Sequence, residues 1–143
     1  MDMPPRLAEI VDEFADAPRD LVLEMLLEYA DGLPPLPDQL EHGGMEQVPE
    51  CQTPFFLHAE VHNDRTVAVW FDCPPEAPTT RAFAGILAEG LADATADEVL
   101  AVPGDLYHRM GLDHVISPLR VRGGSAILAR LQRQVRDQLA AAA

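Results

Sequence analysis

The stretch FFLHAEVHNDRTVAVWFD, residues 55–72, decides the fold class of this chain. In each half of the stretch, one set of alternate positions is apolar throughout, and a period of two is typical of a strand with one buried face. The pair Asn63-Asp64 between the halves is typical of a tight turn. We therefore predict two strands, residues 55–61 and 67–72, that pair as an antiparallel hairpin.

Two helices are predicted before the hairpin. In residues 5–17, apolar side chains recur at i, i+3, i+4 and i+7, which defines one buried face. Residues 19–29 carry a wider apolar arc that includes Leu23 and Leu27, so we expect this helix to be packed between layers. Gly32 follows it and is a natural helix terminator.

Helical patterns resume after the hairpin. Thr79 or Thr80 is expected to cap a third helix. Thr95 and Glu98 have the spacing of a capping box, which predicts a short fourth helix. Residues 105–110 are expected to add one more turn.

A final helix is expected to follow the pair Gly123-Gly124, with Leu128 and Leu131 on its apolar face. The predicted strands and helices are thus segregated along the chain. This order predicts an α+β fold, in which a small antiparallel sheet packs against helices. A length of 143 residues corresponds to one compact domain, residues 1–143.

The charge balance limits the partners of this chain. Ten basic residues, all of them arginine, face 24 acidic ones, for a net charge of −14. Such acidity excludes sequence-independent binding of nucleic acid and disfavours anionic membranes, whereas a partner with a basic patch is favoured. Neither a secretory signal nor an apolar span of membrane length is recognised, so we expect a cytoplasmic protein with reduced thiols.

Cys51 is the candidate reactive residue. It lies between a proline-rich segment, residues 32–49, and the first predicted strand, and a loop-borne thiol is well placed to react. A small buried hydrophobe is the other interpretation of a free cysteine. Glu50 directly precedes Cys51, and a carboxylate so close to a thiol would raise its pKa. A self-sufficient cysteine hydrolase is therefore disfavoured.

The second cysteine, Cys73, ends the second predicted strand and is interpreted as structural. Two cysteines and five histidines show no zinc-binding spacing, so no metal site is expected. A disulfide between Cys51 and Cys73 is not expected in a reducing compartment.

Three motifs of the chain resemble those of the SufE family, which includes the CsdE relatives. Residues 29–36 (YADGLPPL) resemble the family's helix end followed by Leu-Pro-x-Leu. Residues 48–57 (VPECQTPFFL) resemble its hallmark V-x-G-C-Q-S-x-V-W-L, and residues 116–124 (ISPLRVRGG) resemble its closing L-S-P-S-R-x-N-G-L. The motifs occur in the family's order and together span most of the chain.

The resemblance implies a SufE/NifU-like fold and a sulfur-acceptor role. Cys51 would take sulfane sulfur from a cysteine desulfurase as a persulfide, activate that enzyme, and relay the sulfur to iron–sulfur cluster assembly. The implied partners are a SufS- or CsdA-like desulfurase and a scaffold such as SufBCD. Pyridoxal phosphate would belong to the desulfurase, so the chain would need no cofactor and would be a sulfurtransferase-like carrier rather than a stand-alone enzyme.

Residues beside the thiol follow from the same resemblance. Gln52 matches the family's glutamine, and Arg120 matches its arginine after Ser-Pro. We expect the Arg120 guanidinium to favour the Cys51 thiolate and to counter Glu50, with a salt bridge on an irregular loop as the alternative. Glu50 and Pro54 depart from the family's pattern, which has glycine directly before the cysteine.

Two functions of other classes stay open at this point. In one, the fold is a non-catalytic interaction module and Cys51 is passive. In the other, Cys51 and Cys73 form the couple of a thiol-redox protein.

Overall fold

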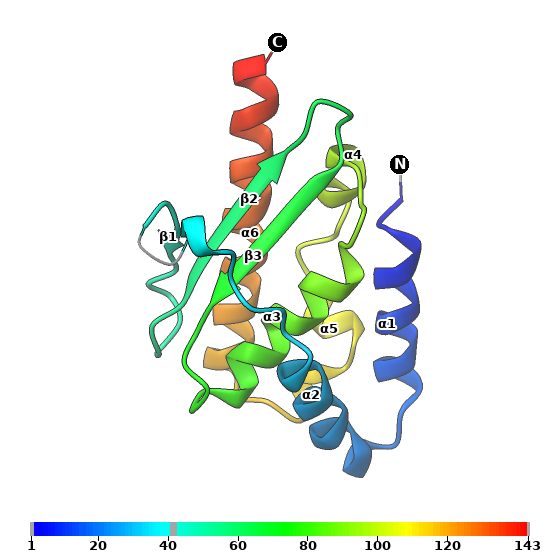
Figure 1. Ribbon diagram of the computed structural model, residues 1–143. Helices are drawn as coiled ribbons and strands as arrows, with labels where there is room; N and C mark the ends of the chain where they lie inside the picture. Colours follow the sequence, from blue (N-terminus) through cyan, green and yellow to red (C-terminus); the bar gives the residue numbers. More distant parts are fainter. Residues whose placement is uncertain (1, 41–42, 143) are drawn as a thin grey trace.

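A computed structural model describes residues 2–40 and 43–142, and within them six α-helices and three strands form one α+β domain (Figure 1). The predicted fold class is confirmed. The elements are α1 (Pro5–Asp16), α2 (Val22–Asp31), β1 (Glu46–Gln47), β2 (Phe56–Val61), β3 (Val67–Asp72), α3 (Pro78–Gly90), α4 (Ala96–Leu100), α5 (Leu106–Arg109) and α6 (Pro118–Ala142). Short 3-10 turns add Arg19–Leu21, Asp38–Leu40 and Leu112–His114.

The predicted hairpin of β2 and β3 is confirmed. The strands pair antiparallel from Phe56 opposite Asp72 to Val61 opposite Val67. The Asp64 carboxylate accepts a hydrogen bond from the Thr66 amide, as a turn side chain should. The alternation also holds, because the side chains buried from the two strands are Leu57, Ala59, Val67 and Phe71.

A third strand, β1, pairs antiparallel with β2 and makes the sheet order β1-β2-β3. Glu46 lies opposite Leu57 and Gln47 opposite Phe56. This strand was not predicted, because two polar residues inside a proline- and glycine-rich segment carry no periodic signal. Pairing with β2 makes it a strand, and the α6 side chains Arg130 and Gln134 bind its Glu46 carboxylate.

Strand β1 has only two residues, and side chains of α6 bond to the part of β2 that β1 does not reach. The Gln134 side chain accepts a hydrogen bond from the Ala59 amide at 2.8 Å. The Gln138 side chain accepts from the Val61 amide and donates to the Ala59 carbonyl, both at 2.8 Å. These bonds satisfy an edge of β2 that would otherwise be open to another chain.

The core lies where α3 packs on α1, α2 and α6 beside the sheet (Figure 1). Residues 82–87 of α3 are all buried. Helix α2 approaches α3 so closely that a Cβ added at Gly85 would lie 2.0 Å from the Tyr29 carbonyl oxygen. Only glycine permits this contact.

Three helix expectations need correction. Helix α2 is covered on one side only, because Leu23 and Leu27 are 59% and 50% exposed. Helix α3 begins at Pro78 after Ala77 and has no side-chain cap, and the Thr80 hydroxyl donates backwards to the Ala77 carbonyl. Proline at the first position starts this helix instead of a threonine cap.

Helix α6 begins at Pro118, before the glycine pair that was expected to precede it. The Ser117 hydroxyl accepts a hydrogen bond from the Arg120 amide, which is the N-cap contact, and Pro118 takes the first helical position. Gly123 and Gly124 lie inside the helix and are buried. The capping box at Thr95, in contrast, is confirmed.

In residues 2–40 and 43–142, no helix has both the length and the hydropathy that are needed to span a membrane.

The edge contacts of α6 lead to a stability prediction. Replacing Gln138 by alanine leaves two backbone groups of β2 without protein partners, so we expect Gln138→Ala to lower the free energy of unfolding by about 1–2 kcal/mol. Urea denaturation measures the change. Arg136→Ala, at an exposed position of the same helix, is the control and should stay within about 0.5 kcal/mol of the parent. Equal changes in the two variants would contradict a role for the edge bonds.

Candidate functional site

The loop between β1 and β2 carries Cys51 and is closed at its base by two buried residues. Val48 and Phe55 are 1% and 0% exposed, and the Val48 amide donates to the Phe55 carbonyl at 2.8 Å. The Cys51 amide donates to the Val48 carbonyl at 3.2 Å, which forms a turn at the start of the loop. The sheet therefore holds the thiol at a defined place although its neighbours are irregular.

The Cys51 thiol rests against α6. Its Sγ lies 3.9 Å from the carbonyl oxygen of Gly123, and the side chain is half-buried. A pocket of about 170 Å³ opens beside it. The residues that shape this pocket include Gln52, Glu76, Thr79, Leu119 and Arg120.

Burial controls the protonation of Cys51. Loss of hydration, and then the Glu50 carboxylate, raise the pKa of the thiol to about 11. The expected effect of Glu50 thus has the predicted direction, although burial is the larger cause. In this conformation the thiol is protonated at neutral pH and is a poor nucleophile.

The guanidinium that meets Glu50 comes from Arg130 of α6. Arg130 Nε donates to Glu50 Oε1 and Arg130 Nη2 to Glu50 Oε2, both at 3.0 Å. Arg130 Nη1 also donates to Glu46 Oε2 of β1 at 2.9 Å. The hydrogen bonds from Arg130 hold the pKa of the Glu50 carboxyl below its usual range.

Sequence reasoning missed Arg130 and considered only Arg120 as a counter-charge. Arg130 follows Gly123 by seven residues, so both lie on one face of α6, the face that meets the loop. The spacing would have placed Arg130 beside the Cys51 loop only if the helix had been predicted to begin before Gly123.

The structure brings the other predicted site residues to the same pocket. Gln52 is exposed and lines it, and Arg120 lines it from the first turn of α6. The Arg120 guanidinium donates to the Thr79 hydroxyl at 3.4 Å rather than to an acidic partner. Its role toward the thiol stays a prediction.

Cys73 and the described histidines do not line this pocket, although Cys73 adds to the raised pKa of Cys51. Cys73 is buried, and both cysteines are free thiols. Among the described residues, no three His, Cys, Asp or Glu side chains gather as metal ligands. The His58 ring stacks on Trp70 across the hairpin.

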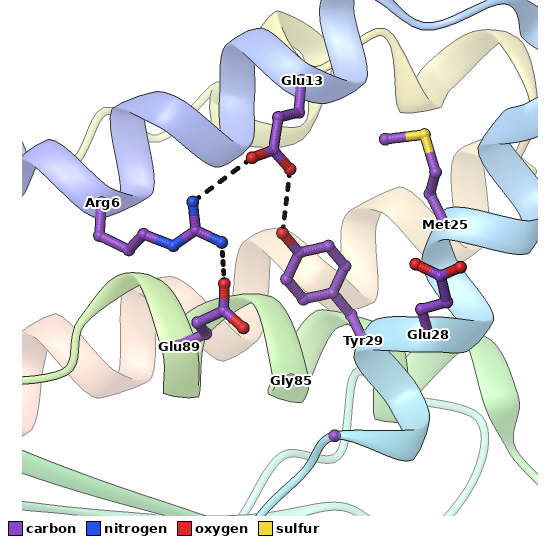
Figure 2. A pocket seen from close by; sticks show the side chains of 8 residues that line it. Arg6, Glu13, Met25, Glu28, Tyr29, Gly85 and Glu89 are labelled. Atoms are coloured by element: carbon purple, nitrogen blue, oxygen red, sulfur yellow. Dashed lines mark hydrogen bonds and ion pairs between the residues drawn. The ribbon is translucent and has the colours of Figure 1, made fainter.

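A second pocket lies between α1, α2 and α3 and holds an ion-pair network (Figure 2). Arg6 bridges Glu13 and Glu89, and the Tyr29 hydroxyl donates to Glu13 at 3.2 Å. Burial and the Glu13 carboxylate raise the pKa of Tyr29 to about 12. These polar groups satisfy one another and join three helices, so we interpret this pocket as structural.

Comparison with known proteins identifies related chains. The family model described as SufE, Fe-S metabolism associated domain, matches residues 8–135. Two uncharacterized SufE-like proteins from Mycobacterium tuberculosis, one from strain CDC 1551 and one from strain H37Rv, are each 50% identical over 135 residues, covering 94% of this chain and 94% of the relative. The solution structure of a hypothetical protein from Thermus thermophilus is similar with a TM-score of 0.86 and 46% identity, covering 96% of this chain and 98% of that one.

The glycine pair of α6 leads to a matched pair of substitutions. A Cβ at Gly124 would lie 3.0 Å from the Tyr107 ring and 3.1 Å from the Phe83 ring, both fully buried, so Gly124→Ala should lower the free energy of unfolding by about 1–2 kcal/mol. A Cβ at Gly123 would make an ordinary contact, 3.5 Å from Cys51 Sγ. Gly123→Ala should therefore keep the free energy of unfolding or raise it by up to about 1 kcal/mol. It should also slow alkylation of Cys51, because the added methyl group contacts Sγ.

Urea denaturation and the rate of reaction with iodoacetamide measure the two effects. Equal stability changes in the two variants, or faster alkylation of Gly123→Ala, would contradict this packing.

The Arg120 expectation is tested by titrating the thiol. If this guanidinium favours the thiolate, Arg120→Ala raises the pKa of Cys51 by about half a unit, a modest effect because Arg120 is exposed. Arg122→Ala removes the same charge from the next exposed arginine of α6 and is the control. The same Cys51 pKa in the parent and in Arg120→Ala would rule the expectation out.

Proposed function

The chain belongs to the SufE family, which places it in iron–sulfur metabolism, and from this premise we propose that it accepts sulfur from a cysteine desulfurase on Cys51. The proposal includes stimulation of the desulfurase, since removal of the sulfur frees that enzyme for another turnover. The sulfur would then pass to an iron–sulfur scaffold of the SufBCD type.

The proposed step is an exchange at sulfur. The Cys51 thiolate attacks the outer sulfur of a persulfide on the desulfurase, a new S–S bond forms on Cys51, and the S–S bond of the donor breaks. The donor's cysteine leaves as a thiolate and takes up the proton that Cys51 lost. Sulfur is transferred with no net oxidation or reduction, so no electron acceptor is needed.

The position of Cys51 is the observation that carries the proposal. Its thiol lies on a loop at the edge of an open pocket, in the segment that matches the family's cysteine motif. The pocket residues that the structure describes include no histidine, and the acidic groups Glu50 and Glu76 would hinder rather than promote thiolate formation. Such a site suits a carrier whose reaction is started by another protein.

The division of labour follows from the same site. The desulfurase would hold pyridoxal phosphate and perform the C–S bond cleavage, so this chain would need no cofactor for its part. The net charge of −14 supports a partner surface with basic groups.

The test is sulfur loading by a SufS-type desulfurase. Incubating the protein with the desulfurase and cysteine should add the mass of one sulfur atom, and peptide mapping should place it on Cys51. Cys51→Ser should take up none, whereas Cys73→Ala, which removes the other free thiol, should load as the parent does.

Two results would overturn the proposal: no adduct on the parent, or the same adduct on Cys51→Ser. Full stimulation of a desulfurase by Cys51→Ser would favour the interaction module. A Cys51–Cys73 disulfide formed under mild oxidant, without sulfur loading, would favour the redox protein.

A further inference from the structure

Arg130 ties the Cys51 loop to α6, and we propose that its ion pair with Glu50 is a latch that sets how often the thiol is exposed. Arg130 is thereby a positioning residue, because it acts on Cys51 through the loop and not by contact with the reacting sulfur. This inference rests on the proposed function for its purpose, since a sulfur acceptor must present its thiol to another protein.

The geometry of the pair is that of a strong polar tether. Two nitrogens of one guanidinium meet two oxygens of one carboxylate, which is the bidentate arrangement that fixes both side chains. The remaining terminal nitrogen of Arg130 binds Glu46 in β1. One side chain of α6 therefore holds both the strand that enters the loop and the residue that precedes the thiol.

The loop has little else to hold it. Among the described residues, the side chains of 49–54 make one other hydrogen-bond contact, the weak one from Cys51 Sγ to the Gly123 carbonyl at 3.9 Å. The Thr53 hydroxyl is buried without a partner. Loss of the Arg130 bonds would leave the tip of the loop held mainly by Val48 and Phe55 at its base.

Opening the loop and breaking the pair are the same movement. The Glu50 carbonyl oxygen and the Cys51 Cα both lie 3.7 Å from the position of a Cβ on Gly123, so the backbone of the loop rests directly on α6. Moving the thiol away from Gly123 draws the Glu50 backbone away from the helix. A displacement larger than the Glu50 and Arg130 side chains can span therefore breaks their bidentate contact.

The strength of the pair suits a latch that a partner opens. The side chains of Arg130 and Glu50 are 29% and 40% exposed, so water screens their attraction. A partly exposed pair of this kind shifts an equilibrium by about threefold to tenfold, which is enough to favour the closed loop and little enough for docking to reverse. Charged groups on a docking surface could replace either half of the pair.

The test measures alkylation of Cys51 by iodoacetamide, a neutral reagent that neither charge attracts. Peptide mapping separates its label on Cys51 from that on Cys73. We expect Arg130→Met to react about threefold to tenfold faster than the parent at neutral pH, with the midpoint of its pH–rate profile at lower pH. An effect on charge alone has the opposite sign, because losing Arg130 leaves the Glu50 carboxylate uncompensated beside the thiol.

Two comparisons isolate the pair. Arg136→Met removes the same charge from an exposed position of α6 that makes no hydrogen bond with any described residue, and its rate should equal that of the parent. In a Glu50→Gln background, adding Arg130→Met should give little further acceleration, because both substitutions open the same contact.

If Arg130→Met does not fold, a second measurement on Glu50→Gln still tests the latch. Glu50→Gln changes an exposed side chain, and hydrogen exchange at the Cys51 amide, which is bonded to the Val48 carbonyl, reports loop opening independently of thiol charge. Faster exchange in Glu50→Gln is expected. Unchanged exchange there, slower or unchanged alkylation of Arg130→Met, or equal acceleration by Arg136→Met would overturn the latch.

The latch and the proposed function fail separately, because alkylation and hydrogen exchange use no desulfurase. A parent protein that takes no sulfur while Arg130→Met is alkylated faster would refute the sulfur-acceptor role and leave the latch in place. A parent that loads sulfur while Arg130→Met is alkylated no faster would refute the latch alone.

Discussion

The close approach of the Cys51 loop to α6 is the contact on which the candidate site depends. Gly123 lies under the thiol, and Gly124 lies under the rings of Tyr107 and Phe83, so the same turn of helix is the floor of the site and part of the core. A bulky side chain at Gly123 would displace the Cys51 loop, and one at Gly124 would displace the two buried rings. Farther along the helix, Gln134 and Gln138 replace the missing edge of the sheet. The edge of the sheet and the thiol are therefore both positioned by α6, which also packs against α3 in the core.

This arrangement explains why the thiol rests in an unreactive state. Loss of hydration outweighs every nearby charge at Cys51 and raises its pKa to about 11, so the thiol is almost entirely protonated at neutral pH. A protonated and half-buried thiol resists oxidants and stray electrophiles. Reactivity then requires a change of environment, which, under the proposed function, docking of a sulfur donor would supply.

The departure of this chain from its family's cysteine motif is matched by a compensating residue. A carboxylate in place of glycine directly before the cysteine would, alone, add an unpaired negative charge beside the thiol. The structure places Arg130 against that carboxylate with two parallel hydrogen bonds. The bonds from Arg130 pair the Glu50 carboxylate and attach it to α6. The charge of Glu50 still contributes to the raised pKa of Cys51. One of the ten arginines of this acidic chain, Arg130, thus pairs with Glu50.

Elements with a local signal could be predicted from the order of residues alone. Alternation in residues 55–72 specified the hairpin, the Thr95–Glu98 spacing specified a capped helix, and the motif around Cys51 identified the candidate thiol. Strand β1, the helical state of the glycine pair and the partner of Glu50 depended instead on the folded chain, whereas the start of α6 carries a local capping signal in Ser117-Pro118. Strand β1 exists because β2 lies beside it, and Gly123-Gly124 stay helical because close packing outweighs their low helix propensity. Glu50 and Arg130 are 80 residues apart. No local pattern records such a contact, since the fold alone brings the two residues together.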